Sequence, residues 1–149
     1  MKINHLTVLG LCLCIFFASC KKDDDTSICD IEIPAGTRFF EFQNDGGDTF
    51  YAWTNKADVI AAVEAQLSVP LEQRSQHING KIARIEGDCS INQNWSWYFL
   101  ADDWLLADAS IEVCDGNPQY VEDNLEDYLA IERYCPWGST VLKEVTQPF

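Results

Sequence analysis

The chain has 149 residues and a formal net charge of −14, because only 10 basic side chains accompany 24 acidic ones. So few cations cannot displace counterions from a phosphate backbone, which excludes nucleic acid as a ligand and argues equally against anionic lipid headgroups. Cations, basic proteins and neutral glycans remain compatible with this charge, although solubility alone also explains an acidic surface.

Residues 1–19 have the pattern of an export signal. Lys2 precedes an apolar run of about 12 residues at 6–17, which is shorter than the roughly 20 residues of a membrane span. The run ends in Phe17-Ala18-Ser19-Cys20, which resembles the processing site of bacterial lipoproteins, with phenylalanine where leucine is usual. The resemblance implies lipidation of Cys20; an ordinary signal peptide cleaved near Ser19 is the alternative.

The lysines and aspartates at 21–25 resemble the signal that directs Bacteroidota-type lipoproteins to the outer face of the outer membrane. Acyl chains such as palmitate contribute about 0.8 kcal/mol per buried methylene, so two or more anchor a protein without a transmembrane helix. We therefore predict a signal peptide at 1–19, a lipidated cysteine with a charged tether at 20–36, and one domain at 37–149. The expected location is the outer membrane, on the cell surface, or otherwise in the periplasmic leaflet.

The first half of the domain predicts a hairpin and a helix. Strands are expected at 38–42 and 49–53, with the turn sequence at 44–48 between them. A helix should follow at 57–67, capped by Thr54 or Asn55, because its apolar residues recur at helical spacing.

The second half predicts strands around one further helix. A strand at 77–85 changes its apolar face partway, which indicates a bulge, and a strand at 94–100 alternates Trp95, Trp97 and Phe99 on a core face. A short apolar strand is expected at 111–114, and Asn117 should cap a helix from Pro118 to Leu129. Residues 139–145 are rich in β-formers and predict the last strand.

These elements predict the α+β class: one mainly antiparallel sheet with two helices packed on one face, stapled by disulfides. The order of elements resembles propeptide-type and cystatin-type inhibitor domains in topology alone. A protease-inhibitor-like module is therefore one alternative function, although a fold does not carry function.

Four cysteines remain in the mature domain after the signal and the lipid site are set aside: Cys29, Cys89, Cys114 and Cys135. An even number in an exported chain predicts two disulfides, with three connectivities open. Cys135-Pro136 resembles the active site of a monothiol glutaredoxin, but a strand follows it where that family has a helix. No helix N-terminus or cation is evident that would lower the thiol pKa, so we interpret Cys135 as a half-cystine.

Three segments together resemble a family of small secreted domains of bacteria, slime moulds and fungi: NWSW at 94–97, IEVCD at 111–115 followed by YVE at 120–122, and CPWGS at 135–139. The resemblance covers about residues 38–145 and implies no settled activity. It implies a bond between Cys114 and Cys135, which leaves Cys29 and Cys89 as the second pair.

No arrangement of residues predicts a catalytic site. His77, the single histidine of the mature chain, cannot form a zinc site without thiolates, and no Gly-x-Ser-x-Gly motif accompanies it. Acidic residues do gather at 102–115: Asp102, Asp103, Asp108, Glu112 and Asp115. They could bind calcium, but they lack EF-hand spacing, so we predict no metal site and no cofactor, with calcium as the alternative.

We predict a non-catalytic binding module for a protein or glycan ligand, attached to the membrane through its lipid anchor and without nucleic acid as a partner. Trp104 is the tryptophan expected to be exposed, and with Asp102 and Asp103 it is the candidate binding residue. A small hydrolase that uses two carboxylates of the acidic cluster is the enzymatic alternative.

Overall fold

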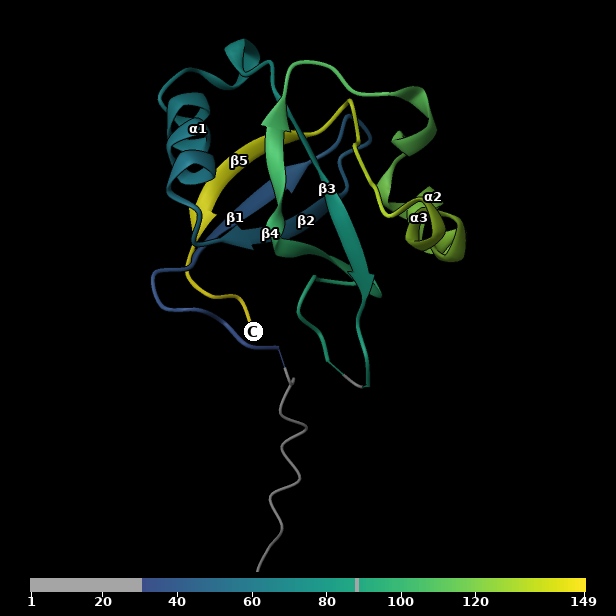
Figure 1. Cartoon of the computed structure of the whole chain (residues 1–149). Helices are drawn as coiled ribbons and strands as arrows, with labels where there is room; N and C mark the ends of the chain where they lie inside the picture. The colour runs from purple at the N-terminus through teal and green to yellow at the C-terminus, as the bar shows by residue number, and fades with distance from the viewer. Residues whose placement is uncertain (1–30, 88) are drawn as a thin grey trace, which may run out of the picture.

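A computed structural model describes residues 31–87 and 89–149. The predicted signal peptide, the predicted lipidation site Cys20 and Cys29 lie outside the described residues. The domain is α+β with antiparallel sheets, as predicted, and its C-terminus lies at the bottom in Figure 1. Among the residues that the structure describes, no helix is long and apolar enough to cross a membrane.

The strands form two sheets where the sequence predicted one. The hairpin of β1 (Arg38–Gln43) and β2 (Thr49–Thr54) pairs with β5 (Thr140–Val145) in the order β2-β1-β5, and β3 (His77–Arg84) pairs with β4 (Trp97–Ala107). All these pairs are antiparallel. Rings from the two sheets meet between them, with Phe50 of β2 5.8 Å from Phe99 of β4.

An irregularity in β4 sets which of its residues face the core. Gly80 pairs with Trp104 and Ile82 with Phe99, so four β4 residues lie opposite the single residue Lys81. The three extra residues are an odd number, so the side chains of β4 change faces across the bulge. Trp97 and Phe99 before it and Trp104 after it are therefore all buried.

Helix α1 (Ala57–Leu67) follows the hairpin as predicted and buries Val59 and Val63. Its predicted cap at Thr54 or Asn55 is wrong, because the N-cap residue is Lys56 and no side chain caps the helix. The second predicted helix is divided into α2 (Pro118–Asp123) and α3 (Leu125–Ile131) at Asn124. Its predicted cap is confirmed, because the Asn117 side chain accepts a hydrogen bond from the Tyr120 amide. The break occurs where the Asn124 side chain donates to the Tyr120 carbonyl and its backbone leaves the helical region.

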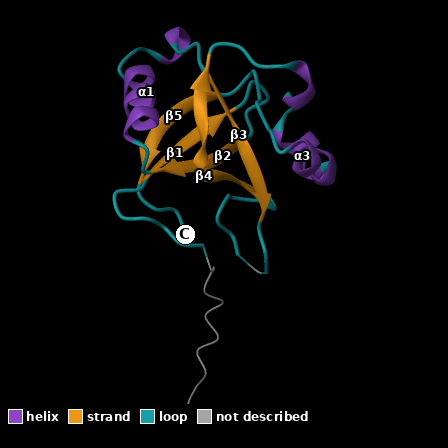
Figure 2. Ribbon diagram, viewed as in Figure 1, coloured by secondary structure: helices purple, strands orange, loops and turns teal. Residues whose placement is uncertain are grey.

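Helix α1 and the α2–α3 pair lie at opposite edges of the strands in Figure 2, and α1 contacts β4 and β5 while α3 contacts β3. Two short 3-10 turns, η1 (Leu71–Gln73) and η2 (Glu112–Cys114), complete the described elements. The helices thus cover the two ends of the sheet interface, and each packs on different strands.

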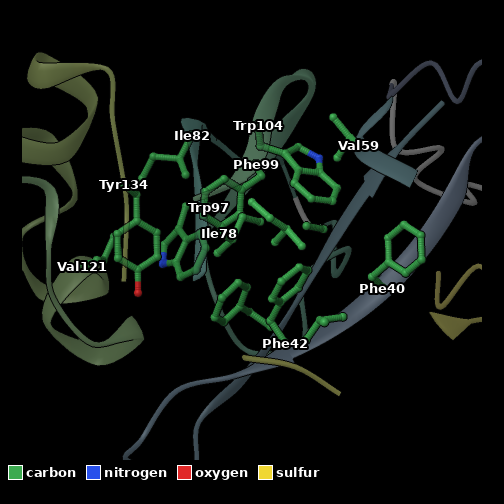
Figure 3. Close-up of a cluster of buried hydrophobic side chains, with 14 of the residues drawn as sticks. Phe40, Phe42, Val59, Ile78, Ile82, Trp97, Phe99, Trp104, Val121 and Tyr134 are labelled. Carbon is green, nitrogen blue, oxygen red and sulfur yellow. The ribbon is translucent and has the colours of Figure 1, made fainter. Parts of the chain in front are cut away.

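The main core is aromatic and fills the space between the sheets (Figure 3). Tyr134 stacks on Phe99 with ring centroids 5.6 Å apart and meets Trp97 edge-on at 5.2 Å. Tyr134 also exchanges both backbone hydrogen bonds with Gly80, at 3.0 and 2.8 Å. The segment before β5 is therefore fixed to β3, and this contact positions the residues that follow it.

A second cluster covers the other face of the three-stranded sheet. Phe39 and Trp53 pack there with Ile31, the first described residue, and with Phe149 at the end of the chain. Both described ends of the chain therefore lie at the same end of the domain.

Candidate functional site

A disulfide joins Cys114, at the end of η2, to Cys135, which precedes β5 (Cα–Cα distance 5.2 Å). The bond that the family resemblance implied is confirmed, and both cysteines are fully buried. Cys89 is disulfide-bonded as well, while its predicted partner Cys29 lies outside the described residues. Within the described domain, Cys135 therefore serves as a structural half-cystine, and no thiol chemistry is available to it.

The strand predicted at 111–114 is wrong, because residues 112–114 form the turn η2 and Ile111 is its N-cap residue. Ile111 and Val113 are 66% and 63% exposed, whereas Cys114 is buried, so the apolar run does not enter the core. The Cys135 amide donates to the Cys114 carbonyl at 2.7 Å beside the disulfide. The bridge thus holds η2 on the surface, with two large apolar side chains pointing outward.

Further apolar side chains are exposed beside this turn. Val113 from η2, Tyr120 from α2 and Ile131 from α3 line one hollow of about 190 Å³, together with Asp127 and Tyr128. Tyr120 is 56% exposed and Ile131 41%. Four exposed apolar side chains thus surround the Cys114–Cys135 bridge: Ile111, Val113, Tyr120 and Ile131. We call this surface the disulfide face.

The disulfide face lies in a strongly acidic part of the chain. Residues 85–132 contain twelve acidic side chains and no lysine or arginine. Basic residues outside this stretch form ion pairs with three of its carboxylates, those of Asp103, Glu126 and Glu132. No ion pair of the described chain includes Glu112 or Asp127, so negative charge at this face is not neutralised by side chains of the domain.

A second hollow, of about 250 Å³, lies at the start of β3 and is lined by Ser75, His77, Asp108, Ala109, Ser110 and Trp137. We call it the His77 hollow. Two larger hollows, of about 310 and 280 Å³, adjoin the β1–β2 turn, and none of the described residues that line them is aromatic or basic. Unlike these two hollows, the His77 hollow combines an indole, an imidazole, hydroxyls and a carboxylate.

A chain of hydrogen bonds orients the polar side chains of the His77 hollow. The Arg133 guanidinium donates to the side-chain oxygen of Asn79 at 3.4 Å, and because arginine can only donate, this contact fixes which end of the Asn79 amide is the oxygen. The amide nitrogen of Asn79 then donates to the Ser110 hydroxyl at 2.6 Å. His77 Nε2 lies 2.7 Å from the same hydroxyl oxygen. The side-chain amide of Gln76 donates to the Asp108 carboxylate at 3.1 Å. These bonds fix the wall before any ligand arrives.

Burial lowers the pKa of His77, against the opposing effect of the Asp115 and Asp108 carboxylates. A lowered pKa means that His77 binds a proton more readily in the unfolded chain than in the folded one. The stability that neutral His77 contributes is therefore fully present above about pH 6.5, and it is lost as the pH falls below that value. We predict that the denaturant midpoint of the wild type falls more between about pH 7.5 and 5 than that of His77→Gln. Equal pH profiles of the two proteins would contradict this role of His77.

The predicted acidic cluster does not converge on one site. Asp102 and Asp103 lie within β4, and Asp103 pairs with Lys81 and Arg133, whereas Asp108 contacts Gln76 and Asp115 accepts the Trp137 amide. No group of three or more His, Cys, Asp or Glu side chains is placed to hold a metal ion in the described part of the chain.

The expected exposure of Trp104 is wrong. Its side chain is 2% exposed, and its indole N–H donates to the Trp53 carbonyl at 2.8 Å inside the core. The tryptophan at the surface is Trp137, which is 48% exposed and lines the His77 hollow. The only signal for its exposure in the sequence is the run of glycine and polar residues that follows it, which is typical of a loop.

The geometry defines a disulfide-stapled α+β domain with an acidic, partly apolar face and a small polar hollow beside it. The family model of the BP-74 N-terminal domain matches residues 36–148, and the chain belongs to this family. Comparisons with curated proteins and with solved structures found no significant match.

Proposed function

We propose that this protein is a membrane-anchored binding module without catalysis, which docks a partner protein on the disulfide face. The observation that carries the proposal is the convergence of Val113, Tyr120 and Ile131, from three separate elements, on one hollow. Exposed apolar side chains that gather in a patch mark an interaction surface, whereas single ones are ordinary.

The chemistry of the disulfide face specifies its partner. Tyrosine and large aliphatic side chains supply the desolvated centre of protein interfaces, with a polar rim around them. Asp127 lies in the hollow and Glu112 within η2, so the rim is acidic. A partner that fits would present apolar side chains flanked by lysine or arginine, and the opposite charges would speed association.

The position of the chain ends supports an anchored module. Ile31 and Phe149 pack against the same cluster at one end of the domain, and Figure 1 shows that the loop after β4 and η2 lie toward the other end. A lipid on Cys20, joined to the domain through the residues before Ile31, would therefore attach it at the end away from η2. The proposed location is the outer membrane, on the cell surface.

Lipidation can be tested by Cys20→Ala. We expect the wild type to partition into the detergent phase of a phase-separating detergent, and the variant to remain aqueous or to accumulate as an unprocessed precursor. The acyl chains supply the membrane affinity, so their loss removes it. A variant that matures normally and still enters the detergent phase would contradict the lipoprotein proposal.

Docking can be tested by replacing two residues of the hollow, in Val113→Asp/Ile131→Asp. Both side chains are exposed, so the double variant should fold, and its thermal unfolding should match the wild type. Leu71→Asp is the matched control, because Leu71 is 49% exposed in η1, away from this face. Each purified protein is used as bait in a pull-down from envelope extracts of the cells that naturally produce it.

We expect the wild type and Leu71→Asp to capture the same basic protein, and the double variant to lose it by at least about tenfold, which corresponds to roughly 1.4 kcal/mol. Capture should weaken as salt is raised, because the partner is attracted by the acidic rim. Equal capture by all three baits, or capture that salt leaves unchanged, would overturn the proposed face.

A further inference from the structure

The His77 hollow is a separate feature from the disulfide face, and docking on that face does not use it. Its walls come from three segments: the start of β3, the loop after β4, and the loop that precedes β5. With about 250 Å³ it is smaller than the roughly 300–1,000 Å³ of sites that enclose drug-sized ligands. A ligand that fits is therefore small, or is one terminal unit of a larger molecule.

Trp137 forms the aromatic wall, and the chain around it is fixed. Its backbone N–H donates to Asp115 at 2.9 Å, and Cys135 and Pro136 before it are buried. Ser139 after it is also buried, with its hydroxyl accepting the Ile78 amide at 3.2 Å. An exposed indole on so rigid a segment loses little conformational freedom when a ligand covers it.

The opposite walls offer both donors and acceptors. The hydroxyl of Ser110 is held between Asn79 and His77, and the Asp108 carboxylate is held by Gln76. A carboxylate accepts up to about four hydrogen bonds, so Asp108 retains acceptors for ligand hydroxyls. Burial lowers the pKa of His77, so its neutral imidazole adds no positive charge for an anion.

We propose that the His77 hollow binds one neutral sugar residue, with a C–H face of the ring on Trp137 and hydroxyls on Asp108 and Ser110. An aromatic wall opposite fixed hydroxyl and carboxylate groups matches a ring that is apolar on its faces and polar at its edge. The acidic surroundings oppose sugars that carry a carboxylate or sulfate.

The test is a titration of the mature lipoprotein, in a detergent without a sugar headgroup, with methyl glycosides of the common neutral hexoses, 6-deoxyhexoses, pentoses and N-acetylhexosamines. Binding is followed by the backbone amide NMR signals of Ser75, His77 and residues 108–110, which line the hollow and remain in every variant. We expect at least one glycoside to bind with a Kd of about 1 mM, as suits a small open site. Trp137→Ala and Asp108→Asn should each weaken it at least about tenfold.

Tyr120→Ala is the matched control, because it removes an exposed aromatic side chain from the disulfide face and should leave sugar binding unchanged. Arginine amide and a methyl glucuronide are the charged controls and should not bind. The proposal is overturned if no neutral glycoside shifts the amide signals of the hollow at about 50 mM, or if Trp137→Ala binds as well as the wild type. Binding of arginine amide in place of the glycosides would show a cation site and would equally overturn it.

Discussion

Replacing Cys135 with serine should lower the melting temperature substantially and leave Cys114 open to alkylation. The bond closes a loop between residues 21 positions apart, for which chain-entropy estimates give about 3 kcal/mol. For a domain of this size that corresponds to a fall on the order of 10 °C. Both sulfurs are buried, so the variant also leaves a polar hydroxyl in a site built for a disulfide.

The control is the double variant Cys114→Ala/Cys135→Ala, which removes the bridge without a buried hydroxyl and should lose somewhat less stability. Peptide mapping without reduction measures the bond directly, and thermal unfolding measures its effect. If Cys135→Ser had the same melting temperature as the wild type and lost only an enzymatic activity, Cys135 would be a reactive thiol, and its structural role would be wrong.

Trp104→Ala should destabilise the domain by about 3–5 kcal/mol, as is usual when a buried tryptophan is truncated. Trp104 meets Phe42 edge-on at 5.9 Å and Phe40 at 6.4 Å, so the variant leaves a cavity between the two sheets. It also removes the indole donor from the buried Trp53 carbonyl.

Trp137→Ala provides the comparison, because it removes the same side chain from a half-exposed position. We expect it to change the free energy of unfolding by roughly 0.5 kcal/mol or less, since surface substitutions have small effects. Urea unfolding of both variants measures the difference. Similar losses for Trp104→Ala and Trp137→Ala would contradict the assignment of Trp104 to the core and of Trp137 to the surface.

Local sequence patterns, each spanning a few residues, predicted much of the fold. The hairpin of β1 and β2, the helix α1 and the cap at Asn117 all lie where turn residues, helical spacing and an Asn-Pro pair indicated them. The break at Asn124 escaped prediction because an asparagine within a helical pattern is common, and only its bond to the Tyr120 carbonyl shows that it ends the helix.

The burial of Trp104 depends on pairing that the sequence does not display. Continued from Trp97 and Phe99, a regular alternation places Trp104 on the solvent face, and the adjacent Asp102 and Asp103 strengthen that expectation. The three extra residues opposite Lys81 reverse the face, and they are visible only once β3 and β4 are paired.

The candidate sites depend on contacts between distant segments. Val113 and Ile131 were apolar residues in or beside predicted elements, and nothing in their spacing showed that η2 and α3 bring them to one exposed hollow. The contact of His77 with Ser110 joins the start of β3 to the loop after β4, 33 residues further along. The bond between Cys114 and Cys135 was predicted only through a resemblance to relatives that carry the pair.

Photo-crosslinking in intact cells tests most directly whether the disulfide face is a docking surface. A photoreactive amino acid replaces Val113 in one strain and Leu71 in another, because both side chains are exposed and lie on different parts of the domain. We predict that the probe at position 113 crosslinks to one basic protein, and that the probe at position 71 does not. Absence of any crosslink at position 113, or the same crosslinked protein from both positions, would contradict the proposal.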